Sequence, residues 1–182
     1  VGLAALRGRR LAEDLVAHLD LPEAPVSAMD GWAVRANDTP GNLRVVGESA
    51  AGCPMAQRLG AGQAVRISTG ARLPETSDAV VRLEDADADR DLVSVPGVVA
   101  GRDVRPAGCE YRAGALVLSA GTTVSAHDVG SIAGLGHADM ACLPRPRVAI
   151  VASGDELVPL NSALRPGMVW DSNRPMLAAL IT

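Results

Sequence analysis

The chain has 182 residues, of which 48% are hydrophobic and only 2% aromatic, with no phenylalanine. Such a chain can bury one good core or two small ones, built from Val, Leu, Ala and Ile. Its net charge of −4 argues against a nucleic-acid partner, and no apolar run is long enough to span a bilayer. All basic side chains are arginine, so any basic contact to an anion must use a guanidinium. We expect no signal peptide, no zinc or disulfide framework from three scattered cysteines, and a cytoplasmic location.

The first hundred residues predict a helix followed by a small β domain. Leucines near helical spacing predict a helix over residues 1–20, ended by Pro22 and Pro25. Short β-prone runs separated by Gly, Pro, Asp and Ser then indicate an all-β domain. Its strands are expected at 43–46, 64–68, 79–83 and 92–95, with an acidic hairpin tip at 86–91.

The remaining residues predict the start of an α/β unit. A strand is expected at 116–118, then a helix capped by Ser125 and Asp128 and stopped by Gly136. After a proline-bounded linker, the apolar run 147–152 predicts a buried parallel strand, and residues 175–181 predict a helix. One strand and one helix cannot complete an α/β sheet, so we expect the chain to be a fragment.

Two polar turns could carry chemistry in the first part of the chain. Asp30 precedes Gly31 in a turn that could hold its carboxylate for a ligand, although the same turn could simply satisfy backbone amides. Thr69 and Gly70 follow a predicted strand, where a hydroxyl and free amides could bind an anion, or form an ordinary β-turn.

Two further segments in the last part are candidates. Ser153-Gly154-Asp155-Glu156 follows the predicted parallel strand, where open α/β sheets bind ligands, and its carboxylates suit Mg²⁺. Asp171-Ser172-Asn173 are good helix-capping residues at an N-terminus that could attract an anion. The charged segment 102–110 could equally form surface ion pairs, each contributing about 0–1 kcal/mol. The three histidines have no paired ligands and are interpreted as structural or solvent-facing.

Several motifs in order resemble the molybdopterin molybdenumtransferase family, which includes MoeA and the gephyrin E domain. Ser27 to Val34 matches SAMDG-(Y/W)-AV, and Ala64 to Pro74 is similar to AVRI-x-TGA-x-(L/V)P. The other matching segments are 11–14, 47–52, 78–85, 102–114, 146–158 and 166–177. The resemblance therefore covers nearly the whole chain.

The resemblance implies a multidomain α+β fold. A small all-β domain (38–102) would be inserted in a mixed α/β connecting domain (1–37 and 103–145). Residues 146–182 would begin a three-layer, MogA-like, molybdopterin-binding α/β domain. The family resemblance also implies a homodimer, with each site formed between one subunit's β domain and the other's α/β domain. A partner of the molybdopterin adenylyltransferase type is possible.

The implied activity is insertion of molybdate into adenylylated molybdopterin, with Mg²⁺ and release of AMP. The residues carried over are Asp30, Thr69, Glu110 and Glu156 as catalytic, Ser27, Gly70, Ser153, Gly154, Ser172 and Asn173 as substrate-binding, and Asp155 and Asp171 as metal ligands. The family's further molybdate-handling residues lie beyond this chain, so the fragment alone is expected to be inactive.

Two departures from the family pattern leave alternatives open. Val26 stands where the family usually has Asn, and the family's GED reads Gly108-Cys109-Glu110 here. The chain could therefore belong to a paralogue of the same fold that binds molybdopterin or acts as a scaffold without catalysis. A tungsten-preferring paralogue is the third possibility.

Overall fold

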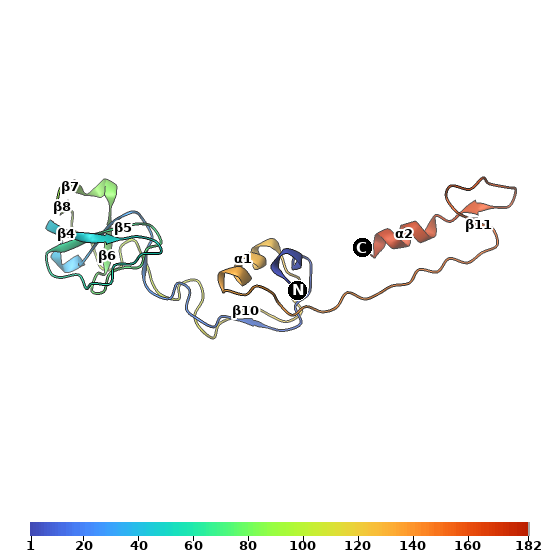
Figure 1. The fold of residues 1–182 in the computed structure, drawn as a ribbon, viewed down its shortest axis with the longest axis horizontal. Helices are drawn as coiled ribbons and strands as arrows, with labels where there is room; N and C mark the ends of the chain where they lie inside the picture. The colour runs from blue at the N-terminus through green and yellow to red at the C-terminus, as the bar shows by residue number, and fades with distance from the viewer. Residues whose placement is uncertain (182) are drawn as a thin grey trace. The chain divides into compact units, whose positions relative to one another are not determined.

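The computed structural model describes residues 1–181 and divides the chain into two compact units, Val1–Leu143 and Pro144–Thr182. Both units are drawn in Figure 1. No helix within residues 1–181 has the length and apolar character needed to cross a membrane.

A six-stranded sheet forms the larger part of the first unit. Its strands are β3 (Gly31–Val34), β4 (Gly41–Ser49), β5 (Gln63–Ile67), β6 (Ala79–Arg82), β7 (Asp87–Asp89) and β8 (Leu92–Val95), in the order β6-β3-β5-β4-β8-β7. Only the β4–β5 pair is parallel. The four predicted strands are confirmed as β4, β5, β6 and β8, and the acidic tip is the β7–β8 hairpin.

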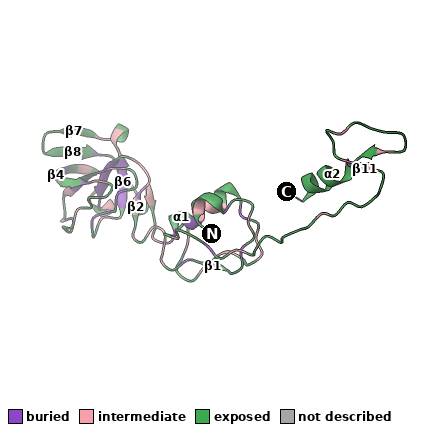
Figure 2. Cartoon of the chain, turned by 45° about the vertical axis from the view of Figure 1, so that its right-hand side comes forward, coloured by how far each residue is buried: buried purple, intermediate pink, exposed green. Residues whose placement is uncertain are grey.

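Strands β3 and β6 are buried on both faces of the sheet (Figure 2). In β3, Trp32 and Val34 pack into one apolar cluster, whereas Ala33 packs into the other. Neighbouring β6 repeats the pattern, with Val81 on the first side and Val80 on the second. Side chains of a strand alternate between faces, so a continuous apolar run such as this needs cover on both sides. Short 3-10 helices at Ala36–Asp38 (η2) and Leu83–Asp85 (η3) follow β3 and β6.

Two antiparallel strand pairs lie outside this sheet in the first unit. The chain enters and leaves the sheet region through β2 (Val26–Ser27) and β9 (Val104–Arg105), which pair with each other. The second pair joins β1 (Leu15–Val16) to β10 (Leu116–Leu118), which confirms the predicted strand at 116–118.

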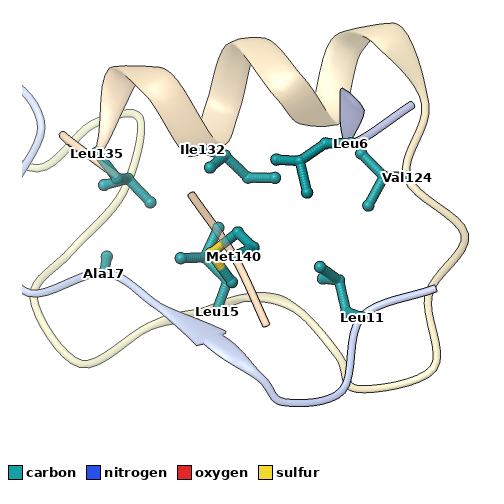
Figure 3. Packing of buried hydrophobic residues seen from close by; sticks show 8 residues of the cluster. All are labelled: Leu6, Leu11, Leu15, Ala17, Val124, Ile132, Leu135 and Met140. Atoms are coloured by element: carbon teal, nitrogen blue, oxygen red, sulfur yellow. The ribbon is translucent and has the colours of Figure 1, made fainter. Parts of the chain in front are cut away.

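A separate core of eight buried residues lies beside β1 and β10 (Figure 3). Its members are Leu6, Leu11, Leu15, Ala17, Val124, Ile132, Leu135 and Met140. Ile132 comes from the helix α1 (Ala126–Gly134), which has the predicted capping box: the Asp128 amide donates to Ser125 Oγ, and the Ser125 amide donates to Asp128 Oδ2. The helix packs its apolar side into this core, and Gly136 (φ 81°) follows it as predicted.

The predicted helix over residues 1–20 is wrong. Only a 3-10 turn, η1 (Leu3–Ala5), forms, and Leu15 lies in the strand β1. Gly8 adopts φ 77°, which interrupts any right-handed helix, and its amide donates to the Val124 carbonyl instead (2.8 Å). Leu6, Leu11 and Leu15 are buried in the eight-residue core, which they enter from separate segments, whereas Leu3 and Leu19 are only partly buried.

Strand β3 lies before the boundary expected at residue 38. The strand Gly31–Val34, which the predicted connecting domain contains, is an inner strand of the six-stranded sheet. Aside from this strand, the division into connecting and β domains stays a prediction.

The second unit contains few regular elements. A two-stranded parallel sheet joins β11 (Leu157–Val158) to β12 (Val169–Trp170), and α2 covers Asn173–Leu180. The predicted strand at 147–152 is wrong here, because these residues form no strand and are mostly exposed. A parallel strand depends on neighbours and on cover from both faces, and this chain supplies neither. The predicted helix at 175–181 is confirmed, although α2 begins two residues earlier.

Candidate functional site

The carboxylate of Asp30 and the residue Thr69 meet at one end of the sheet. Asp30 Oδ1 accepts hydrogen bonds from the Thr69 amide (2.6 Å) and from Thr69 Oγ1 (3.0 Å). Asp30 immediately precedes β3, and Thr69 follows β5 by two residues. Because β3 and β5 are antiparallel neighbours, with Gly31 opposite Ile67, the start of one strand lies beside the end of the other. The structure therefore joins two predicted site residues that are 39 positions apart.

Ser27 and Gly70 belong to the same cluster of turns. The Gly70 amide donates to the Ser27 carbonyl (2.8 Å), and the Ser27 amide donates to the Ala71 carbonyl (2.9 Å). Gly70 adopts φ 79°, a conformation that glycine takes at little cost. Ser27 is buried, and its hydroxyl donates to the Met29 carbonyl (2.5 Å). Its hydroxyl thus stabilises the turn that carries Asp30, whereas Gly70 is exposed next to Thr69.

The site favours an ionised carboxylate. The hydrogen bonds from the Thr69 amide and hydroxyl lower the pKa of Asp30, and the positive charge of Arg66 lowers it further. Arg66 lies opposite Trp32 in the β3–β5 pair, and its guanidinium is 5.8 Å from the centre of the Trp32 ring. This distance is within the range of a cation–π contact. A charged carboxylate, a hydroxyl and a guanidinium thus gather at one exposed end of the sheet.

Sequence reasoning assigned no role to Arg66, although the residue lies inside a quoted motif. Because side chains alternate between faces along β5, Arg66 lies on the same face as Ala64, away from the face of the buried Val65 and Ile67. That alternation alone does not identify Trp32 as its neighbour, since the strand pairing must be known first.

Glu110 lies in a different local environment. Its carboxylate pairs with Arg105 Nη2, and its amide donates to the Leu21 carbonyl (2.9 Å). Arg105 lies in β9, opposite Val26 of β2. The structure places Glu110 in an ion pair and shows no contact that joins it to Asp30.

The second unit brings several other predicted residues around one hollow of about 290 Å³. Ser153, Asp171 and Asn173 line it, together with apolar residues of segment 150–152, Leu157 of β11 and Leu177 of α2. Gly154 lies beneath the carboxylate of Glu156, since a β-carbon added at Gly154 would be 2.6 Å from either oxygen.

The two predicted metal ligands differ in their availability. Asp171 is buried, Oδ1 accepts from the Arg174 amide (3.1 Å), and Oδ2 pairs with Arg174 Nε (3.0 Å). It caps α2, so its oxygens do not fit the role of a free cation ligand. Asp155 is exposed and can offer hard oxygen donors. Within residues 1–181 no three His, Cys, Asp or Glu side chains cluster to hold a metal. Ser172 makes no capping bond through its side chain.

Comparison with known proteins identifies the family. Residues 1–136 match the family model described as the MoeA N-terminal region (domain I and II). The match covers well over half of the chain, and the chain therefore belongs to this family, as the motifs suggested.

Named relatives agree with this assignment. The chain is 39% identical over 189 residues to a molybdopterin molybdenumtransferase of Nostoc sp., covering all of this chain and 43% of that protein. It is 36% identical over 192 residues to molybdopterin molybdenumtransferase 2 of Mycobacterium tuberculosis, covering 47% of that protein. The chain thus spans about half the length of the curated relatives that it matches.

Solved structures support the same fold. A molybdopterin biosynthesis MoeA protein from Pyrococcus horikoshii, in two crystal structures, superposes on all of this chain with TM-scores of 0.88 and 0.92 at 31% sequence identity. The matched part is 48% and 50% of those chains. The MoeA fold is therefore supported for this chain as a whole.

Proposed function

We propose that this chain contributes the N-terminal half of a molybdopterin molybdenumtransferase, which inserts molybdate into adenylylated molybdopterin and releases AMP. The observation that carries the proposal is the bond between Asp30 and Thr69. Both residues lie in motifs of this family, and the fold brings them together at an exposed end of the sheet. The relatives of this chain carry names from molybdenum cofactor biosynthesis.

Each group at this end of the sheet has a chemical role in the proposal. The Asp30 carboxylate accepts both donors of Thr69 through Oδ1, so Oδ2 stays available to orient a donor of the substrate. The exposed guanidinium of Arg66 suits phosphate or molybdate oxygens, which it can bind in a fork. Thr69 keeps the carboxylate in one orientation, and such preorganisation is where enzymes gain much of their rate.

Mg²⁺ is part of the proposal through the second unit. Mg²⁺ commonly binds one or two carboxylates together with substrate phosphates. Asp155 and Glu156 fit that partial role by their donor chemistry, whereas the capping bonds of Asp171 do not. When bound, the ion would neutralise charge on the phosphoanhydride oxygens.

AMP release tests the proposal directly. Full-length protein is incubated with adenylylated molybdopterin, molybdate and Mg²⁺, and AMP is measured. Asp30→Asn should reduce AMP release by at least about a hundredfold, a typical cost of losing one preorganised group. Asp87→Asn, on the exposed strand β7, is the matched control and should leave the rate unchanged. Wild-type release from Asp30→Asn would refute the role of Asp30, and no release from the wild type would refute the activity.

A homodimer with shared sites, in the cytoplasm, belongs to the same proposal. If one subunit supplies Asp30 and the other Asp155, two inactive full-length variants, Asp30→Asn and Asp155→Asn, should regain part of the activity after subunits are mixed. Mixed dimers would contain one site with neither substitution. No recovery in verified mixed dimers would place both residues in the same subunit's site.

The ion pair of Glu110 favours a second candidate function. Arg105 occupies the Glu110 carboxylate, which the family resemblance places among the catalytic groups. A non-catalytic paralogue that binds molybdopterin or acts as a scaffold would not need a free Glu110 carboxylate. Tight binding of molybdopterin by the wild type, without AMP release under any metal, would support this second candidate.

A further inference from the structure

Arg82 and Asp103 form a two-pronged ion pair beside the turn that carries Asp30. Arg82 Nε donates to Asp103 Oδ2 (2.8 Å), and Nη2 donates to Oδ1 (3.0 Å). Such a fork fixes both groups in orientation as well as distance. Asp103 is only 13% exposed in its side chain, and it also accepts from Arg102 Nε (3.1 Å).

The backbones of both partners are bonded to this turn. Arg82 lies opposite Gly31 in the β3–β6 pair, and the next amide, that of Leu83, donates to the Asp30 carbonyl (3.2 Å). From the other side, the Ala28 amide donates to the Asp103 carbonyl (2.9 Å). The ion pair therefore joins the two chain segments that flank Asp30.

The backbone of Asp103 indicates that this arrangement is held under constraint. Asp103 adopts φ 51°, the left-handed region that residues other than glycine enter at a cost. Such a conformation persists only where several contacts determine it together. Here these contacts are its carboxylate bonds to Arg82 and Arg102 and its carbonyl bond to Ala28.

We propose that the Arg82–Asp103 ion pair is a positioning device that holds the Ser27–Gly31 turn so that the Asp30 carboxylate stays on Thr69. Neither Arg82 nor Asp103 touches the substrate in this proposal; both act through the turn. Its consequence for catalysis rests on the proposed function, whereas its effect on the bond between Asp30 and Thr69 does not.

The first unit offers a matched control in the Arg58–Glu75 pair. Arg58 Nε is 3.5 Å from Glu75 Oε1, with both side chains 68% exposed. An exposed pair of this kind contributes little to structure. If any ion pair of this domain had the same effect, Arg58 and Arg82 variants would behave alike.

The test uses the full-length protein with Arg82→Met, Arg82→Lys and Arg58→Met. The amide proton resonance of Thr69, which reports its bond to Asp30, is measured by NMR, alongside kcat and KM for AMP release. Arg82→Met should shift this resonance upfield and lower kcat on the order of tenfold, with KM little changed, because misplaced groups cost rate. Arg82→Lys should restore part of both, since it keeps the charge without the fork, and Arg58→Met should match the wild type.

An unchanged Thr69 resonance in folded Arg82→Met would overturn the proposal. Should Arg82→Met fail to fold, Asp103→Asn, which preserves the side-chain shape, decides by the same resonance. A shifted resonance with unchanged kcat would overturn the catalytic consequence. A wild type that releases no AMP would refute the proposed function, while the Thr69 resonance would still decide the positioning role.

Discussion

Gly31 lies against the carbonyl oxygen of Val81, so close that a β-carbon added at Gly31 would be 2.1 Å from that oxygen. The clashing atom belongs to the backbone of β6, which cannot move aside without breaking the β3–β6 pairing. Only glycine fits here, directly after Asp30. The requirement for glycine at this point of the motif is therefore one of packing between strands.

Gly31→Ala should lower the free energy of unfolding by at least about 2 kcal/mol, because overpacking forces the backbone apart. Gly130→Ala is the control, since nothing lies within 4 Å of its added β-carbon and the position is within α1. This second change should stabilise the protein by about 0.5–1 kcal/mol. Urea unfolding of both variants measures the difference, and equal effects would contradict the packing argument.

Because of the ion pair of Asp103, the free energy of unfolding should decrease at acid pH. Hydrogen bonding from Arg82 lowers the pKa of Asp103 from 3.8 to about 2. A carboxyl group whose pKa is lower in the folded state stabilises the protein above its ordinary pKa and loses that contribution as the pH falls. The wild-type advantage over Asp103→Asn in urea unfolding should therefore be constant above about pH 5 and shrink between about pH 5 and pH 1. An advantage that does not change over this range would contradict the pairing.

Thr69 should control the ionisation of Asp30. Thr69→Val removes the hydroxyl donor but leaves the amide, so the pKa of Asp30 should rise toward 3.8 without reaching it. Thr69→Ser keeps the hydroxyl and should retain the low pKa. Carboxyl ¹³C shifts recorded during an acid titration give both values. A Thr69→Val protein with the wild-type pKa would show that the hydroxyl contributes nothing.

The capping box of α1 should be measurable as a coupled pair. Ser125→Ala should cost about 1 kcal/mol of unfolding free energy, because the Asp128 amide loses its partner at the helix start. Ser119→Ala, at an exposed position, should cost little. In a double-mutant cycle with Asp128→Ala, the two losses should be less than additive, since each residue caps the other. Strict additivity would indicate that the box does not form in solution.

Local signals in the sequence predicted the elements that depend on neighbouring residues. The capping box of Ser125 and Asp128 and the short strands between turn residues are examples, because their signals lie within a few positions. The N-terminal leucines misled the prediction, since helical spacing does not distinguish one helix from separate turns that enter the same core. The strand β1 forms because Leu15 pairs with Leu118, and that pairing across a hundred residues leaves no local signal.

The candidate site divides in the same way. Asp30 and Thr69 were identified by motifs, but their contact depends on the pairing of β3 with β5. The roles of Arg66 and Arg82 were not predicted from the sequence. Their partners, Trp32 and Asp103, become neighbours only after the sheet has formed. Asp155 and Glu156 lie in a unit whose expected parallel strand did not form. The predicted ligand site at the end of that strand is therefore not formed by a sheet.

The pairing of β2 with β9 brings the two ends of the sheet segment side by side. The chain passes from Ser27 into the sheet and returns at Val104, and these two residues are cross-strand neighbours. Because paired strands lie about 5 Å apart, a short hairpin loop could join residues 27 and 104 directly. The eight-residue core around Leu6 and Ile132 contains no residue from the removed segment. A change confined to residues 28–103, which include Asp30 and Thr69, would thus leave every member of this core in place.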